Sequence, residues 1–401
     1  MSKPISFAQR THWELNANPL SVALAQLRDK NIPFLDLTES NPTACGFQYP
    51  ADKILAALSD EQNMIYSPCP QGLLDARKAV SGYYQKKGIT VDPRRIFLTA
   101  STSEAYSYLF RLLLNPHEKV LVARPSYPLF QFLIEFNDAQ MEFYPLMFDE
   151  ARNRWQIDFK ALKNVISPST KVLVLVNPNN PTGSFVTQQE FQKLQEICIA
   201  QGIAMVSDEV FSDYALTENS NRIISAAAQN AALSFSLGGI SKILGLPQMK
   251  CGWIVINGPE DLIWEASKRL EIIADTYLSV NTPVQNALAQ WLSLQEEIQV
   301  EIRNRLQHNR DFFRRALSSC SQTQIEFLPC EGGWHAILKF PLRNLSEEEW
   351  ALEFLTKDHV YVHPGYFFDF NEEGYFVLSL LLETKVFEEG LSRIFNRVKS
   401  R

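Results

Sequence analysis

The sequence lacks the features that mark several classes of protein. No apolar run is long enough to span a membrane, and the opening MSKPISFAQRTHWELN has no apolar stretch of the kind found in signal peptides. The formal net charge is −7, so the chain does not have the positive excess of a non-specific nucleic-acid binder. No internal repeat or low-complexity tract is visible. We therefore predict a cytoplasmic protein that binds neither membranes nor nucleic acid.

Cysteine is sparse and scattered. None of the six cysteines forms a CxxC pair, so the spacing indicates neither a zinc site nor a disulfide framework, and a reducing compartment fits best. We expect no metal. No GxGxxG motif follows an early strand, which disfavours a nicotinamide dinucleotide site. No helix-turn-helix segment is added at the N-terminus.

Hydrophobic residues make up 46% of the chain, which allows a large core. Short apolar segments alternate with helical ones from about residue 53 onward, a pattern typical of a parallel sheet covered by helices on both faces. We predict seven strands, at residues 95–99, 119–123, 141–145, 172–176, 204–207, 232–236 and 252–255. Ligands of such sheets bind at the carboxyl ends of the strands.

The predicted helices cover residues 19–30, 54–60, 73–87, 103–114, 188–201 and 259–277, followed by one long helix over 284–319. A smaller α/β unit then follows, with strands at 332–340, 361–363 and 375–379 and helices at 346–357 and up to 399. We predict an N-terminal arm that joins the small domain (1–49), a large domain (50–285) and a C-terminal small domain (286–401).

The stretch SLGGISKILGLPQMKCGW (236–253) holds Lys242 and Lys250 in an otherwise uncharged, glycine-rich run. A lysine in an apolar loop is costly unless its amine is neutralised or used. One use is a Schiff base with an aldehyde cofactor, and the alternative is a loop with two solvated lysines.

Polar motifs follow the other predicted strands. NPNNPTG (177–183) forms a rigid turn that presents side-chain amides, and Asp208 ends a buried strand, where a carboxylate needs a partner. ASTSEA (100–105) places hydroxyl side chains at a helix start, which suits an anion. Each has a plainer explanation: an ordinary loop for NPNNPTG, a helix N-cap or a salt bridge for Asp208, and an ordinary helix cap for ASTSEA.

Together these motifs resemble the class I/II aminotransferases, the pyridoxal phosphate-dependent enzymes of fold type I, over nearly the whole chain. The resemblance implies that Lys242 forms the Schiff base, with Ser241 beside it, that Asp208 faces the pyridine nitrogen, and that Asn180 donates to the ring oxygen. It also implies a homodimer in which further residues contact the cofactor. These are Ser101, Thr102 and Ser103 at the phosphate, Tyr127 on the ring face, Lys250 at the phosphate, and Tyr66, Asn281 and Thr282 across the dimer.

Three positions depart from the family pattern. Lys250 stands where the family has an arginine on the phosphate, so we expect weaker or less rigid cofactor binding, because lysine lacks the planar fork. Phe211 replaces a tyrosine that donates to the ring oxygen, so we expect the Schiff base to have a higher pKa; nothing shows that Tyr214 can reach. Val377 stands where the family has the arginine that binds the substrate carboxylate.

The third departure leaves the substrate open. Either another group binds the carboxylate, such as backbone N–H groups near Ser40 and Asn41, or the substrate has none. We predict amino-group transfer from an amino acid or amine to a keto acid. The alternatives are elimination, decarboxylation or oxidation with the same cofactor, and a non-catalytic regulatory protein of the same fold.

Overall fold

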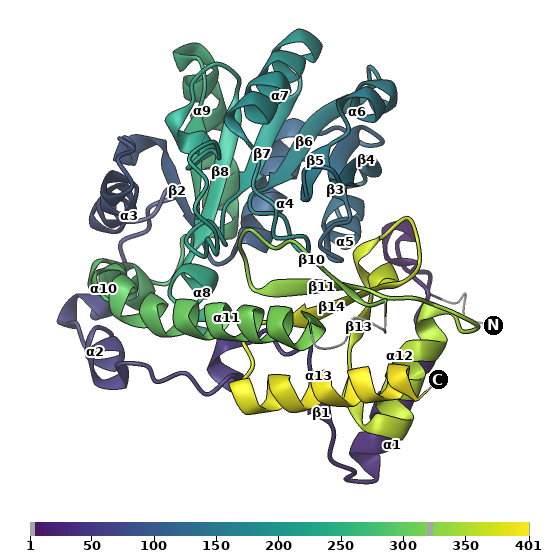
Figure 1. Cartoon of the computed structure of the whole chain (residues 1–401). Coiled ribbons are helices and arrows are strands. Elements are labelled where there is room, and N and C mark those ends of the chain that lie inside the picture. The colour runs from purple at the N-terminus through teal and green to yellow at the C-terminus, as the bar shows by residue number, and fades with distance from the viewer. Residues whose placement is uncertain (1–4, 319–323, 401) are drawn as a thin grey trace.

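The computed structural model describes residues 5–318 and 324–400, and its central element is an eight-stranded sheet (Figure 1). The strand order is β2-β9-β8-β7-β6-β3-β4-β5, in which β9 and β5 run antiparallel to their neighbours. The mostly parallel α/β architecture is thus as predicted. The strands are β2 (Ile96–Thr99), β3 (Lys119–Arg124), β4 (Gln140–Asp149), β5 (Arg154–Ile157), β6 (Thr170–Val176), β7 (Ala204–Asp208), β8 (Ser234–Gly239) and β9 (Gly252–Asn257).

The prediction of seven strands is wrong, because β5 adds an eighth. β5 pairs with the extended second half of β4, with Leu146 opposite Ile157. Its sequence RWQI is short, and only alternate residues are buried. Such a strand lacks the continuous apolar run by which the buried parallel strands were recognised.

Alternate residues of the strands enter two different cores, which explains why both faces need helices. Val172, Val174 and Val176 pack with α4 (Thr102–Leu113), α5 (Phe130–Glu135) and α9 (Glu260–Tyr277). Leu173 and Leu175 pack on the other face with α6 (Phe159–Val165) and α7 (Gln188–Gln201). α3 (Leu74–Lys86) covers that second face at the β2–β9 end.

A smaller sheet has the order β10-β11-β14-β13, and β1 pairs with β12 in a separate parallel ladder. Leu35 of β1 lies opposite Val360 of β12, so a segment near the start of the chain pairs with one near its end. The elements are β1 (Leu35–Asp36), β10 (Glu326–Leu328), β11 (His335–Lys339), β12 (Val360–Tyr361), β13 (His363–Pro364), β14 (Tyr375–Ser379), α1 (Pro19–Asp29), α2 (Ala51–Ala56), α12 (Glu347–Asp358) and α13 (Thr384–Lys399).

The single long helix predicted over 284–319 is wrong. The structure has two helices, α10 (Thr282–Ser293) and α11 (Gln295–Ser318), with a break at Leu294. Leu294 is itself buried, so the apolar pattern continues through the break, and no glycine or proline marks it. The last predicted residue, 319, lies outside the described residues. Among the described helices, none has an apolar stretch suited to crossing a bilayer.

Candidate active site

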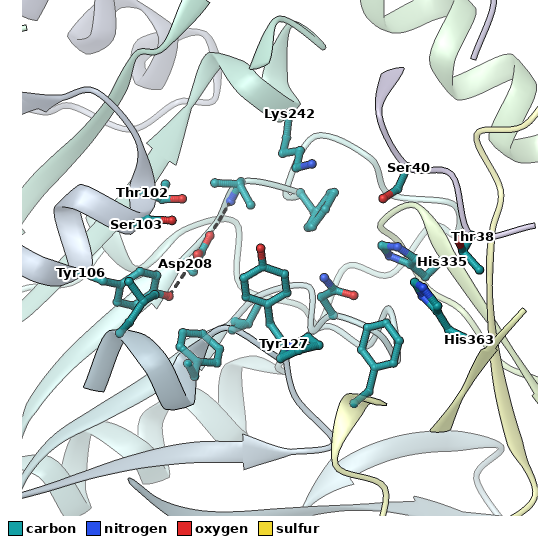
Figure 2. Close-up of a pocket in the computed structure, with 18 residues that line it drawn as sticks. Thr38, Ser40, Thr102, Ser103, Tyr106, Tyr127, Asp208, Lys242, His335 and His363 are labelled. Atoms are coloured by element: carbon teal, nitrogen blue, oxygen red, sulfur yellow. Dashed lines mark hydrogen bonds between the residues drawn. The ribbon is translucent and has the colours of Figure 1, made fainter. Parts of the chain in front are cut away.

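A cavity of about 280 Å³ lies where the parallel strands end at their carboxyl edge. Its walls come from the segments after β2, β3, β6, β7 and β8, together with residues of the small sheet and the 38–40 segment (Figure 2). The side chains used below are Thr38, Ser40, Thr102, Ser103, Tyr106, Tyr127, Asn180, Asp208, Phe211, Lys242, His335, His363 and Phe368.

Asp208 is the last residue of β7, and strand alternation fixes its direction. Ala204 and Val206 face the α4 core, so the carboxylate two residues further on lies on the same side. Tyr106 of α4 donates to Asp208 Oδ2 at 3.0 Å, and the Val210 N–H donates to Oδ1 at 3.2 Å. Burial nevertheless raises the pKa of Asp208 to about 6, and those bonds and Lys242 only partly offset it.

Lys242 lies in α8 (Ile240–Ile243), a short helix that starts directly after β8. Its backbone carbonyl accepts a hydrogen bond from the Tyr214 hydroxyl at 2.7 Å, and the next carbonyl, of Ile243, accepts one from Gln299 at 2.8 Å. Tyr214 is thus engaged with the backbone of Lys242. These bonds fix the helix that carries the amine.

The amine of Lys242 lies among aromatic rings. Nζ is 4.8 Å from the centre of the Trp334 ring and 5.6 Å from that of Phe211. Burial lowers the pKa of Lys242 to about 8, against a smaller opposing effect of Asp208. Among the described residues, no salt bridge joins Lys242 to Asp208, although both line the cavity.

The lowered pKa predicts that Lys242 reacts as a free amine at lower pH than an ordinary lysine. In cofactor-free protein, competitive labelling with acetic anhydride should give a midpoint near pH 8. The same peptide in denatured protein, as the control, should titrate at about 10.4. Mass spectrometry of the labelled peptide gives both curves. Coincidence of the two would contradict the desolvated environment.

The loop after β6 holds an unpaired amide. Asn177 Oδ1 accepts from the Val186 N–H at 2.9 Å, and Asn179 Oδ1 accepts from the Thr182 hydroxyl at 2.9 Å, so both serve the loop itself. Asn180 instead lines the cavity, and its buried Oδ1 has no hydrogen-bond partner. A buried carbonyl oxygen without a donor is costly, and a ligand would relieve it by donating to Oδ1 or, with the amide turned over, by accepting from Nδ2.

The N-terminus of α4 forms one end of the cavity. Ser101 is the N-cap, and its Oγ accepts from the Glu104 N–H at 3.2 Å, so this hydroxyl serves the helix as the plainer interpretation had it. Thr102 and Ser103 line the cavity (Figure 2). Hydroxyls and free N–H groups at a helix start suit a phosphate. Tyr127 points its hydroxyl into the cavity from the segment after β3.

Several predicted residues lie elsewhere. Ser241 and Lys250 are outside the cavity lining, and Lys250 is exposed with a φ of 53°. Tyr66 is 73% exposed. Asn281 caps α10 by accepting from the Val284 N–H at 3.1 Å, which is the ordinary loop-to-helix role, and Thr282 begins that helix.

The three residues considered for substrate binding also lie in different places. Ser40 lines the cavity, whereas the exposed Asn41 caps a short 3₁₀ turn by accepting from Thr43. Val377 is buried against Trp155, Ile337 and Phe368. No arginine is among the described residues that line the cavity.

The sequence analysis missed four polar residues of the cavity: Thr38, Tyr106, His335 and His363. The two histidines are a third of the six in the chain and stand in the motifs GGWH and HPG. That scarcity was an available signal. Their position beside each other, however, depends on strand pairing.

The cavity fits pyridoxal phosphate. A half-buried amine and a buried carboxylate face the same cavity, an amide with an unpaired oxygen lies on the wall, and a helix N-terminus with free hydroxyls lies at one end. These groups suit an aldehyde, a pyridine nitrogen, a ring oxygen and a phosphate respectively. Fold and site therefore define a pyridoxal phosphate-dependent enzyme. The chain belongs to the aminotransferase class I and II family, which residues 32–394 match, and it is a pyridoxal phosphate-dependent aminotransferase.

Similar proteins carry aminotransferase names. The glutamate-pyruvate aminotransferase AlaA of Haemophilus influenzae is 27% identical over 386 residues, covering 94% of this chain and 93% of that protein. The tyrosine aminotransferase of Mus musculus is 25% identical, covering 94% and 84%. The solved structure of an alanine aminotransferase from Pyrococcus furiosus has a TM-score of 0.88, with 24% identity and coverage of 99% and 100%. This last likeness speaks for the fold alone.

Proposed function

We propose that this aminotransferase moves an amino group from an amino acid to a keto acid, with Lys242 and Asp208 as its catalytic residues. When bound, pyridoxal phosphate supplies an aldehyde that takes the amino group and a ring that takes up electrons. The observation that carries the assignment is the desolvated pair itself, an amine with a pKa lowered to about 8 in the same cavity as a carboxylate with a pKa raised to about 6.

The residues of the cavity have separate tasks in this proposal. Nζ of Lys242 would bind the aldehyde covalently. Once substrate has displaced it, the free amine would take the proton from the substrate carbon and deliver it to the cofactor carbon that was the aldehyde, so that the amino group stays with the cofactor. Asp208 holds a proton on the ring nitrogen, and Tyr106 keeps its carboxylate oriented. Asn180 supplies an amide for the ring oxygen, and Thr102 and Ser103 receive the phosphate.

We further propose a cytoplasmic homodimer, in which Tyr66 of one copy approaches the phosphate of the other. The consecutive side chains of Met64, Ile65 and Tyr66 are 89%, 63% and 73% exposed, which is unusual for apolar neighbours and favours burial by a second copy. Sedimentation of an active monomer would contradict this. The exposed Lys250 is not among the cavity residues and remains a candidate for the phosphate only if its loop moves.

A donor screen tests the function. Purified protein with bound cofactor should change its absorbance when mixed with a reactive amino acid and recover when pyruvate or 2-oxoglutarate is added. The keto product should equal the amino acid formed. Recovery without an acceptor, or release of ammonia, would contradict transfer.

One alternative has a specific observation behind it. The S-alkyl-thiohydroximate lyase SUR1 of Arabidopsis thaliana is 28% identical over 255 residues, which is 61% of this chain and 53% of that protein. Elimination with the same cofactor is therefore the second candidate. Formation of a thiol from a sulfur-containing donor, with no need for a keto acid, would favour it.

A further inference from the structure

The end of the cavity away from Thr102 and Ser103 is formed by two imidazoles, those of His335 and His363 (Figure 2). The small sheet sets their common direction. His363 of β13 lies opposite Val377 of β14, which in turn lies opposite Ile337 of β11. His335 is two residues before Ile337, so both histidines project from the same face of the sheet.

Neither imidazole has a hydrogen-bond partner among the described residues, although both line the cavity. The other ionisable side chains of the described lining are Asp208, Lys242, Tyr106 and Tyr127. The lysine and the aspartate are assigned to the cofactor, and the two phenols are neutral, their pKa values raised by burial. No permanent cation is therefore left at this end for the carboxylate that every amino acid and keto acid carries.

We propose that His335 and His363 form the subsite for the substrate carboxylate, and that one of the two imidazoles takes up a proton from solvent when the carboxylate enters. This inference rests on the proposed function, since it names how that site holds its substrate class. It makes the two histidines specificity-determining residues.

The groups around the imidazoles keep both neutral before substrate enters. Burial, Lys242 and His363 lower the pKa of His335 to about 3. Burial lowers the pKa of His363 to about 4, and Asp36 of β1 opposes that shift. Aromatic rings fill the remaining sides: Phe211 and Phe368 at His335, and Tyr361, Phe367 and Phe368 at His363. An entering carboxylate raises both pKa values, because an opposite charge favours the protonated imidazole.

The carboxylate of Asp36 favours a positive charge on His363. Its Oδ1 accepts from the hydroxyl of Thr38 at 2.6 Å and from the Thr38 N–H at 2.9 Å, which fixes the carboxylate behind the subsite. The Thr38 hydroxyl hydrogen is thereby taken, so this side chain offers the substrate only an acceptor. A carboxylate at this end must find its donors in Ser40 and the two imidazoles, and of these only an imidazole can also supply a positive charge.

The affinity for the substrate carboxylate should fall as the pH rises. Binding raises the imidazole pKa, so carboxylate affinity is greatest below the free-state value. It falls by about tenfold per pH unit as the pH rises from the free-state to the bound-state pKa, and then levels out. A permanent guanidinium would give no such fall below pH 10, because arginine stays charged.

The test uses the holoenzyme with an unreactive pair of probes, 3-phenylpropanoate and its neutral analogue 3-phenylpropan-1-ol. Calorimetry at pH 6 in two buffers of different ionisation enthalpy should show net proton uptake with the carboxylate and none with the alcohol. His335→Gln and His363→Gln should each weaken the carboxylate by about tenfold or more and leave the alcohol unchanged, because glutamine can donate but carries no charge. His308→Gln, on an exposed part of α11, is the matched control.

Retained alcohol binding shows that a variant's cavity is intact. Unchanged carboxylate affinity in both variants, or binding without proton uptake, would overturn the subsite, as would equal affinity for acid and alcohol. Failure of the donor screen would instead remove the proposed function, whatever the probes do, so the two failures are distinguishable.

Discussion

Replacing Lys242 by alanine should lower kcat for amino transfer by about 10⁴-fold or more, since both the covalent attachment and the proton transfer depend on its amine. The fold should persist, because the hydrogen bonds from Tyr214 and Gln299 reach backbone carbonyls that alanine keeps. Steady-state assays with the best donor of the screen measure the loss. Circular dichroism and thermal melting check the fold.

Lys250→Ala is the matched control, because it removes an exposed lysine of the same loop that is outside the cavity lining. It should weaken cofactor binding at most and keep kcat when the cofactor is saturating. Borohydride reduction should fix the cofactor to Lys242 in the wild type and in Lys250→Ala. Substantial turnover by Lys242→Ala would refute the assignment of the base.

Asp208→Asn should lower kcat by about 10³-fold, comparable to the loss of a buried electrostatic stabiliser, because an amide cannot hold a proton on the ring nitrogen. Its geometry should survive: the new Oδ1 still accepts from the Val210 N–H, and the Tyr106 hydroxyl can rotate to accept from the new amide. Kinetics at saturating cofactor isolate the chemical effect from weaker binding.

The neighbouring carboxylate provides the comparison. Glu209 is equally buried, but its oxygens accept from Ser207, Ser225 and the Ala226 N–H, so it serves the protein structure. Glu209→Gln should cost about 1–3 kcal/mol of stability and keep most of the activity. If the two variants lost activity alike, the role given to Asp208 would fall.

The position of many cavity residues was predictable from the sequence, because these residues lie at or directly after the carboxyl ends of strands. Asp208 ends a buried strand and Lys242 follows one. Asn180 and Tyr127 stand in the loops after two others, and Thr102 and Ser103 begin the helix that follows β2. In a parallel sheet these positions converge at one edge whatever the details of packing. Local sequence is therefore enough to gather them.

The substrate end was not predictable by that reasoning. His335 and His363 are neighbours only through β14, and Thr38 reaches them only because β1 pairs with β12. Such long-range pairings leave no local periodicity. The break at Leu294 and the strand β5 were missed for the opposite reason, since the local pattern was misleading or weak.

The bonds from Tyr214 and Gln299 to the carbonyls of Lys242 and Ile243 have a mechanical consequence. With its main chain pinned on two successive peptide units, the lysine must travel between cofactor and substrate by rotation about its own flexible four-carbon stem. The range of positions that Nζ can reach is then set by this one side chain. Removing either hydrogen bond would widen that range without changing the chemistry of the amine.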